Sequence, residues 1–314
     1  MKKLALLFGA LSLVSSVAYA KEVVPVVEEV VVVEEAPVTY AAAPALKVTN
    51  VGQFLEVDNT SGKQNIGEGV HFGTNVGLSY EDWTFGIMAR KTWSMDTHSK
   101  NHAEKLDYDS KIKSAGHRID LDAWRHFENF DLGARWRQES NKDRYYLRGA
   151  YNYGMLSGWA DVIYTSMNGA GKDSWEVEIM PVVLTYNGFG IGYNADIVKT
   201  LGADKAKTED DAKAVYDHQI RLYTPTYQVT DKLGLSAEYR YQFQETKKFK
   251  GEAPEWQENN RHIAILNAAY QVSDALSVSG YYEYDFNRYD GHSGAKDQHK
   301  NYYGEFCIGW DYKF

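Results

Sequence analysis

The sequence predicts an all-β protein: a transmembrane antiparallel β-barrel of about fourteen strands with both termini on the periplasmic side. Three observations lead to this fold class. Apolar and polar residues alternate with period two from about residue 48 to the end of the chain. Short connections alternate with longer polar ones along the same stretch. The chain contains 24 Tyr, 8 Trp and 26 Gly but only 6 Pro, and Tyr and Trp concentrate at membrane–water boundaries.

The first 20 residues have the pattern of a cleavable signal peptide. Lys2 and Lys3 precede an apolar stretch from Leu4 to Val17, and Ala18-Tyr19-Ala20 matches the small-x-small cleavage pattern. We therefore expect residues 1–20 to be removed in an envelope with an outer membrane.

Residues 21–46 differ in composition from the rest of the chain and form a Val/Glu/Pro-rich leader. Its three prolines argue against a long helix or a central strand. We expect a periplasmic tether, and the alternatives are a contact with the cell-wall layer or a plug inside the bore. The barrel domain then spans residues 47–314.

The alternation defines the individual strands. In residues 233–243, for example, Leu, Leu, Ala, Tyr, Tyr and Phe alternate with Gly, Ser, Glu, Arg and Gln. One such segment is weak evidence, but a series of segments of about ten residues each is the signature of a transmembrane barrel. Twelve and sixteen strands are the alternative counts. The expected strands are 48–57, 70–80, 83–94, 118–127, 130–139, 144–153, 159–167, 174–186, 189–198, 217–228, 233–243, 261–272, 276–286 and 301–314.

The connections predict the orientation. Bacterial barrels place short turns in the periplasm and long loops outside. The expected short turns are 81–82, 128–129, 187–188, 230–232 and 273–274, and the expected long loops are 58–69, 95–117, 199–216, 244–260 and 287–300. Two connections depart from the size rule, since 140–143 is short and 168–173 is moderate. A soluble β-sandwich, the alternative fold, would not need this alternation.

The last segment, NYYGEFCIGWDYKF, has one aromatic and aliphatic face and ends on Phe314. A terminal strand ending in Phe, with an aromatic residue two positions earlier and Gly three before that, resembles the signal read by the barrel-assembly machinery of Gram-negative envelopes. The matching residues are Gly309, Tyr312 and Phe314, while Cys307 replaces the usual polar residue. The expected partners are this machinery, outer-membrane lipid and lipopolysaccharide.

Charged residues in mid-strand should face the bore, because a charge on the lipid face costs about 2–4 kcal/mol near the bilayer centre. Their parity predicts a pore-lining basic patch on the third to sixth strands, facing acidic sectors. The alternative is a network of ion pairs that fills the lumen. The basic patch comprises Arg90, Arg118, Arg135, Arg137, Arg144 and Arg148, and the acidic positions are Glu176, Glu178, Glu238, Glu283, Asp285 and Glu305.

Two places depart from this parity. Arg125 falls on the apolar side of its strand, which indicates a bulge or a strand end. Residues 261–272 are apolar on both sides, which indicates contact with an inward-folded loop or a subunit interface.

No constellation in the sequence predicts catalysis. The Ser/His neighbours His98-Ser99 and His292-Ser293 fall in polar loops without an obvious third member of a triad. Asp107, Asp109 and His117 are the candidates for a protease barrel, but their loop is rich in polar residues throughout. We therefore expect no enzymatic activity and no catalytic residue.

Composition also excludes several ligands. The formal net charge of −9 argues against nucleic acid as a partner. Cys307 is the single cysteine, so an internal disulfide is excluded. The acidic run 209–211 lacks the ordered ligand spacing of a calcium loop, and we expect no metal and no cofactor.

The signal peptide followed by KEVVP, the acidic leader and a Tyr-rich barrel ending in YKF resemble the fusobacterial major outer-membrane porins. The resemblance covers the chain in architecture and rests on short strings. It implies a non-specific diffusion channel that forms homotrimers, with surface loops that contact other bacteria or host proteins. The oligogalacturonate-type porins, with basic bores, are a second resemblance that only the arginine patch favours.

These observations predict an outer-membrane porin, a water-filled channel for passive diffusion of small hydrophilic solutes and ions. The alternative from another class is a non-conducting structural or adhesin barrel that acts through its surface loops.

Overall fold

A computed structural model describes residues 44–60, 65–96, 111–169, 171–202, 214–248, 256–258, 261–289 and 300–314. The expected signal peptide and nearly all of the leader lie outside these ranges. The long strands are β1 Lys47–Thr60, β2 Asn65–Tyr80, β3 Trp83–Asp96, β4 Lys111–His126, β5 Phe130–Glu139, β6 Lys142–Tyr153, β7 Leu156–Met167, β8 Ser174–Tyr186, β9 Phe189–Thr200, β10 Ala214–Tyr223, β12 Leu233–Lys248, β14 Arg261–Gln271, β15 Leu276–Tyr289 and β16 Lys300–Lys313. Two short pieces, β11 Tyr227–Gln228 and β13 Trp256–Glu258, pair with opposite ends of β12.

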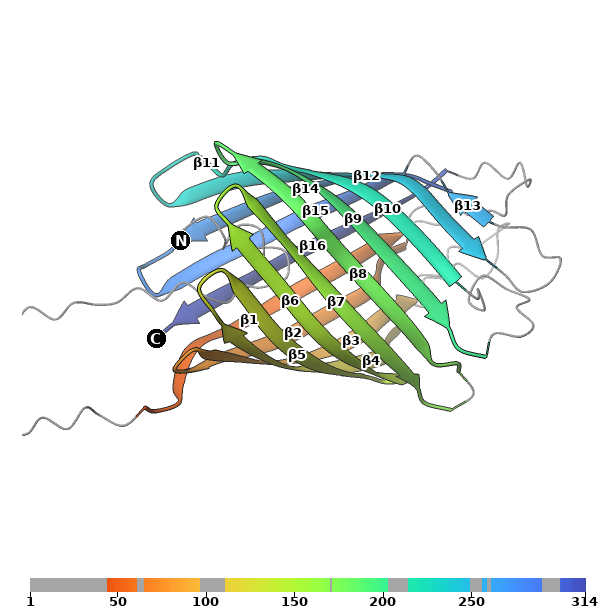
Figure 1. Ribbon diagram of the computed structural model, residues 1–314, viewed down its shortest axis with the longest axis horizontal. Helices are drawn as coiled ribbons and strands as arrows, with labels where there is room; N and C mark the ends of the chain where they lie inside the picture. The colour runs from red at the N-terminus through yellow and green to blue at the C-terminus, as the bar shows by residue number, and fades with distance from the viewer. Residues whose placement is uncertain are drawn as a thin grey trace, which may run out of the picture.

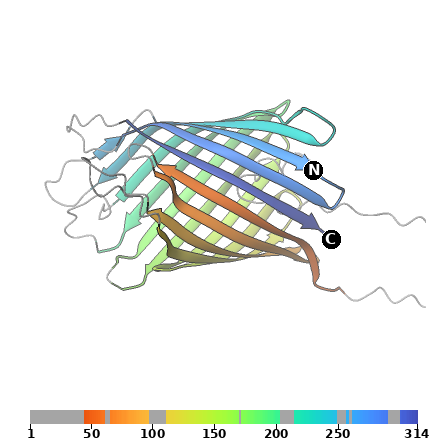
Figure 2. The ribbon, with the colours of Figure 1, turned by 180° about the vertical axis from the view of Figure 1, so that it is seen from behind.

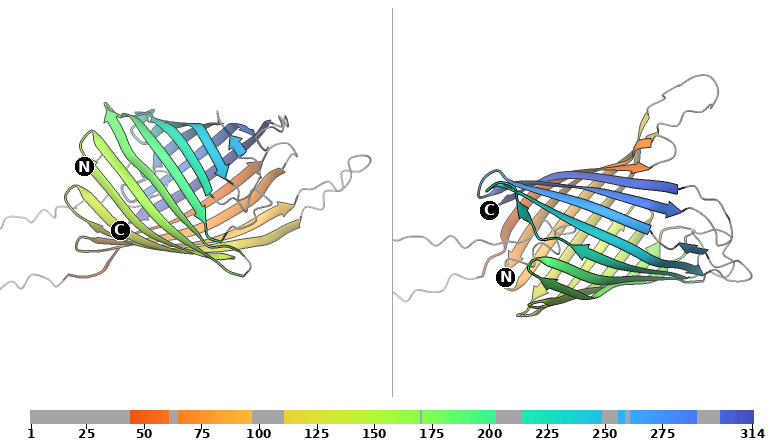
Figure 3. Two further views of the ribbon diagram at one scale, coloured as in Figure 1. Left: turned by 45° about the vertical axis from the view of Figure 1, so that its right-hand side comes forward. Right: turned by 90° about the horizontal axis from the view of Figure 1, so that it is seen from above.

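The long strands form one closed antiparallel barrel (Figure 1). Each strand pairs with the next, β10 pairs with β12 and β12 with β14, and β16 pairs back onto β1. The first and last strands lie side by side in Figure 2, and Figure 3 shows the tilt of the strands around the wall. The predicted fold class is confirmed, and each predicted strand segment except 217–228 corresponds to one long strand.

The short turns gather at one rim. The barrel chain enters and leaves at that rim, where the Phe314 backbone N–H donates to the Thr49 carbonyl at 3.1 Å. Asn187 and Gly188 have φ of 50° and 83°, the positive pair that a two-residue hairpin with right-handed strand twist requires. The periplasmic location of this rim stays a prediction.

At the opposite rim the strands run further than the alternation predicts. β2 begins at Asn65, β4 at Lys111, and β12 continues to Lys248, inside segments expected to be loops. Beyond the membrane both faces of a strand can be polar, so period two fades although the ladder continues. The centres of the five expected long loops lie outside the described ranges.

The predicted strand 217–228 is interrupted between β10 and β11. Pro225 stands at the break, and proline cannot donate to a ladder. The Thr224 backbone N–H donates to the Ala237 carbonyl at 3.0 Å, and the Ala237 N–H donates to the Thr224 Oγ1 at 2.8 Å. The threonine hydroxyl thus replaces a backbone acceptor, and the wall stays paired across the break.

The outer face is an apolar belt. Each of the fourteen long strands contributes an exposed large apolar or aromatic side chain, among them Leu132, Leu147 and Leu266 at 51%, 67% and 57% exposure. Exposed aromatic residues, including Tyr186, Phe189, Tyr227 and Phe314, lie at the turn rim. Such a belt with aromatic girdles is stable only against lipid, so the closed barrel resides in the outer membrane. Among the described residues, no helix is long and apolar enough to cross a membrane.

The inner face is mainly polar. Its side chains that are 3% exposed or less include Asn50, Asp120, Asn194, Asp285 and Asp311, together with the apolar Ile163, Met180 and Val183. The barrel therefore has the inverted polarity of a transmembrane protein, with apolar residues outside and charged ones inside.

A small apolar exception explains the two-sided strand predicted at 261–272. Ile263 and Ile265 of β14 point inward and are 3% and 4% exposed, while Leu266 faces outward. Arg240 of β12 reaches Glu283 of β15 at 3.9 Å, a pair that passes over the strand between them. Long charged side chains thus lie over the isoleucines, so neither an inward-folded loop nor a subunit interface is needed to account for the inner apolar positions.

A charge on the belt should destabilise the barrel according to depth. Leu147→Arg at mid-strand should lower the free energy of unfolding by about 2–4 kcal/mol, whereas Tyr153→Arg at the end of the same strand should cost about 0–1 kcal/mol. Urea unfolding of the barrel in lipid vesicles measures both. Equal losses for the two variants would contradict the assignment of the belt.

Candidate functional site: the charged inner wall

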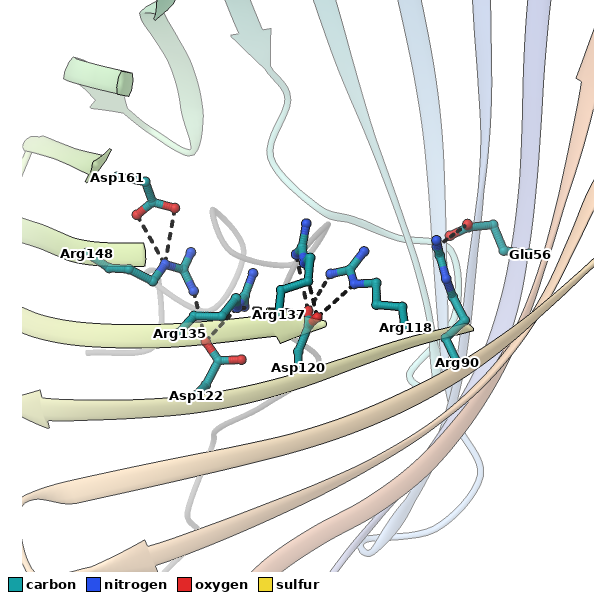
Figure 4. A network of polar contacts seen from close by, with 9 residues as sticks. All are labelled: Glu56, Arg90, Arg118, Asp120, Asp122, Arg135, Arg137, Arg148 and Asp161. Carbon is teal, nitrogen blue, oxygen red and sulfur yellow. Dashed lines mark hydrogen bonds and ion pairs between the residues drawn. The ribbon is translucent and has the colours of Figure 1, made fainter. Parts of the chain in front are cut away.

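Six arginines on four consecutive strands form the arginine patch: Arg90 of β3, Arg118 of β4, Arg135 and Arg137 of β5, and Arg144 and Arg148 of β6. They share the face opposite the exposed belt residues Leu121, Leu132 and Leu147, which is the inner face. Figure 4 shows five of them with the carboxylates they contact. The structure thus brings the six predicted basic residues onto one sector of the inner wall.

Asp120 is the centre of the patch. It is 2% exposed and accepts from two guanidinium groups at once. Nε of Arg118 donates to it at 2.9 Å, and Nε and Nη2 of Arg137 donate at 3.0 Å and 3.1 Å (Figure 4). Two-point pairing of this kind is the strongest form of charged hydrogen bond. It fixes both arginines against the wall.

A second chain of pairs runs from β4 to β7. Arg135 Nε donates to Asp122 at 2.8 Å, and Arg148 Nη1 donates to the same Asp122 oxygen at 3.2 Å. Arg148 Nε also contacts both oxygens of Asp161 at 3.1 Å. Carboxylates and guanidiniums therefore alternate along this part of the wall.

Two further pairs bridge over an intervening strand. Arg90 of β3 lies 3.2 Å from Glu56 of β1, and Arg144 of β6 pairs with Glu176 of β8. Adjacent strands are about 4.8 Å apart, so side chains two strands apart meet most readily on the concave side of a curved wall. These bridges independently place the patch inside the barrel.

Aromatic rings support the guanidiniums. Tyr146 is 7% exposed, and its ring centroid lies 5.6 Å, 5.2 Å and 5.2 Å from Cζ of Arg135, Arg137 and Arg144. Arg148 lies over Trp124 at 4.8 Å. Such cation–π contacts add about 0.5–2 kcal/mol each and hold the arginine side chains in place.

The arginine patch is therefore not a surface of unpaired positive charges. Each of its six arginines has a carboxylate partner, so most of its positive charge is matched locally. The sequence could not show most of these contacts, because Asp120 reaches Arg137, and Asp122 reaches Arg135 and Arg148, only through the registers of β4 with β5 and of β5 with β6.

The next sector carries an acidic row formed by Glu178, Asp196 and Asp217. Asp196 of β9 pairs directly with Glu178 of β8 on one side and with Asp217 of β10 on the other. Like charges at directly opposed positions destabilise a sheet. Arg221 Nη2 is 4.0 Å from Glu178, while the Oδ1 atoms of Asp196 and Asp217 are buried and lack a hydrogen-bond partner within the described residues. Of these three, only Glu178 is among the predicted acidic positions.

The remaining predicted acidic residues also lie on the inner wall. Glu238 accepts from Arg240 Nε at 2.5 Å, and Asp285, fully buried, accepts from Arg261 Nε at 2.8 Å. Glu305 accepts a hydrogen bond from the Tyr281 hydroxyl. The acidic face near the barrel closure is thus partly neutralised by Arg240 and Arg261, which lie outside the predicted basic patch.

The residues of the terminal assembly signal lie on β16 and just after it. Tyr312 and Phe314 are exposed on the outer face, and their rings meet edge to face at 5.2 Å. A Cβ on Gly309 would lie 2.7 Å from the Gln53 carbonyl oxygen and 3.1 Å from Phe54 Cβ. Glycine is needed here because the β1 chain at Gln53 and Phe54 approaches so closely, while the Phe54 ring itself lies over Gly73 of β2.

Arg125 lies at a strand end and not at a bulge. Its Nε donates to Asp82 in the β2–β3 turn at 2.9 Å, and its Cζ lies 5.7 Å from the Trp83 ring and 5.1 Å from the Phe127 ring. The guanidinium thus reaches the water boundary among aromatic residues. The hydrogen bond from Arg125 lowers the pKa of the Asp82 carboxyl below its usual value.

The residues weighed for catalysis fall mostly outside the described ranges: His98, Ser99, Asp107, Asp109, His292 and Ser293, together with the acidic run 209–211. His117 is described and is exposed. Its backbone N–H donates to Ser140 Oγ at 3.0 Å, and its Nδ1 is 3.4 Å from the same hydroxyl. The contact between Nδ1 and the hydroxyl is long for a hydrogen bond.

No family model matches the sequence, and comparison with curated proteins finds no match. A solved structure titled bacterial polysaccharide outer membrane secretin is 10% identical with a TM-score of 0.51, covering 85% of this chain and 98% of that chain. OmpT of Vibrio cholerae is 12% identical with a TM-score of 0.44, covering 89% and 100%. The CymD monoaromatic hydrocarbon channel is 9% identical with a TM-score of 0.46, covering 85% and 89%. The first of these likenesses shows a shared fold and nothing finer.

Removing the shared acceptor of the arginine patch should destabilise the barrel. Asp120→Ala leaves Arg118 and Arg137 without their common partner, and such a loss costs about 3–5 kcal/mol for buried pairs. Urea unfolding in lipid vesicles should show this decrease. Asp82→Ala, which breaks the exposed pair with Arg125, is the control and should change stability little. A small effect of Asp120→Ala would contradict this account, because it would show that water fully solvates the charges of Arg118 and Arg137.

Proposed function

We propose that the barrel is a porin, a water-filled channel for passive diffusion of small hydrophilic solutes and ions. One observation carries this proposal: the ion pairs of the arginine patch lie along the wall. They join residues on one strand, on neighbouring strands or on strands two apart. A network that filled the lumen would instead connect opposite walls.

Barrel size supports the same proposal. Barrels of about eight strands are filled by their own side chains, whereas sixteen to eighteen strands leave an aqueous channel. Among the described residues, the inward arginines fold back onto neighbouring strands, so the wall of this fourteen-stranded barrel leaves space for water between its sides.

We further propose a preference for cations. Among the described residues of the inner wall, acidic side chains outnumber basic ones, and the acidic row has few cationic partners. A bore with excess negative charge concentrates cations. The acidic set is Glu56, Asp58, Asp120, Asp122, Asp161, Glu176, Glu178, Asp196, Asp217, Glu238, Glu245, Glu283, Asp285, Glu305 and Asp311, against the arginine patch with Arg221, Arg240, Arg261 and Lys313.

Membership of the fusobacterial major outer-membrane porin family, with assembly as a homotrimer, belongs to the same proposal. It is supported by the KEVVP leader and by the final YKF. We also propose recognition by the barrel-assembly machinery through Gly309, Tyr312 and Phe314. Contacts of the loops with other cells or host proteins are proposed from the same family resemblance.

Planar-bilayer recording tests the channel and its selectivity. The purified, refolded protein should give discrete conductance steps, with a reversal potential in a salt gradient that indicates cation preference. Replacing the acidic row by amides (Glu178→Gln, Asp196→Asn and Asp217→Asn) should move the reversal potential toward zero, because the acidic row then carries no negative charge.

The control removes three negative charges from exposed turns at the rim (Glu128→Gln, Asp231→Asn and Asp274→Asn) and should move the reversal potential less. An absence of conductance steps would refute the porin and leave the non-conducting structural or adhesin barrel. Equal shifts in both triple variants would contradict a selectivity set by the acidic row.

A further inference from the structure

Three side chains with metal-binding atoms converge on the inner wall near the long-loop rim. Glu56 and Asp58 of β1 and His71 of β2 each offer one ligand atom, and these atoms all lie within 4.8 Å of one another. The register explains the convergence, since Glu56 pairs directly with His71 and Asp58 pairs with Gly69 on the same face. None of the three residues is among the predicted site residues, and the sequence predicts no metal.

The His71 imidazole has a hydrogen-bond partner on each of its two ring nitrogens. His71 is 9% exposed, and its Nδ1 lies 2.8 Å from Thr92 Oγ1 on β3. Its Nε2 faces the carboxylates, 3.0 Å from Asp58 Oδ2 and 3.9 Å from Glu56 Oε1. A partner on the second ring nitrogen is the usual means by which proteins orient a metal-binding histidine.

Gly69 leaves the space in which these groups meet. A Cβ at this position would lie 2.4 Å from Asp58 Oδ2 and 2.9 Å from His71 Nε2. Any other residue would push the carboxylate and the imidazole apart. The missing side chain thus keeps the three ligand atoms close together.

We propose that Glu56, Asp58 and His71 bind a divalent transition-metal ion of the Zn²⁺ type. Zinc takes histidine nitrogen and carboxylate oxygen at about 2.0–2.2 Å, so two ligands of one ion lie within about 4 Å of each other. The present separations need only small side-chain rotations. Three protein ligands leave a fourth position for water, and a nitrogen ligand disfavours Ca²⁺ and Mg²⁺, which select oxygen.

Arg90 is the competitor of the metal. Its Nη1 lies 3.2 Å from Glu56 Oε1 and holds this carboxylate as an ion pair. The metal must share Glu56 with this guanidinium, so the site should bind zinc more tightly when the arginine charge is removed. Arg90→Gln is therefore expected to strengthen binding, and a hydrogen-bonded His71–Asp58 pair with no metal role would not predict this.

The consequence for transport rests on the proposed porin function. The site lies on the inner wall toward the loop rim, where a bound divalent cation would add positive charge to the path. Micromolar zinc should therefore lower the cation conductance of the wild-type channel, and His71→Ala should abolish this inhibition.

Isothermal titration of the refolded, untagged protein in detergent tests binding independently of conductance, with Zn²⁺, Ca²⁺ and Mg²⁺ as separate probes. We expect one Zn²⁺ per chain, at least tenfold weaker binding in His71→Ala and in Asp58→Asn, and tighter binding in Arg90→Gln. His126→Ala is the matched control. His126 also lies between a threonine and an aspartate, 2.7 Å from Thr84 Oγ1 and 2.8 Å from Asp131 Oδ1, but among the described residues it forms an ion pair with one carboxylate instead of two.

The absence of Zn²⁺ binding, or equal loss in His126→Ala and His71→Ala, would overturn the metal site while leaving the porin proposal intact. Zinc binding by a protein that forms no channels would support the site and refute the porin. Displacement of zinc by millimolar Ca²⁺ would contradict the proposed ligand chemistry.

Discussion

The structure depends on the pairing of β16 with β1. A membrane interior offers no water to backbone N–H and C=O groups, so each must find a partner within the protein. The register from Asn50 with Lys313 to Thr60 with Tyr303 closes the sheet and removes its two edges. Once closed, the sheet has an inside and an outside, and period two assigns every side chain to one of them.

That assignment separates two kinds of chemistry. Outside, belt residues such as Leu147 gain stability only from lipid, while Arg125 reaches water at the rim through its pair with Asp82. Inside, guanidiniums and carboxylates satisfy one another along the wall, and Asp120 joins two arginines. Where this matching is sparse, as in the acidic row, the wall has the excess of acidic side chains on which the proposed cation preference rests. Where ligand atoms meet beside a glycine, as at Gly69, these atoms form the proposed metal site.

The strands and the parity of most charges could be predicted from the sequence, because alternation is a local property. Features that depend on register could not. Arg137 and Asp120 are 17 residues apart in the chain, and His71 reaches Asp58 only because Gly69 allows it. The break between β10 and β11 was missed because Tyr227 and Gln228 resume the alternation after Pro225, although the proline itself was a local signal.

Substituted-cysteine labelling on β15 tests most directly whether the charged wall surrounds water. In a Cys307→Ser background, Ser279→Cys faces inward and Val278→Cys faces the lipid belt. A water-soluble cationic thiosulfonate should modify Ser279→Cys in the bilayer and reduce the conductance of each channel, and it should leave Val278→Cys unaffected. Failure to react at Ser279→Cys, or reaction without a change in conductance, would contradict an open, water-filled bore.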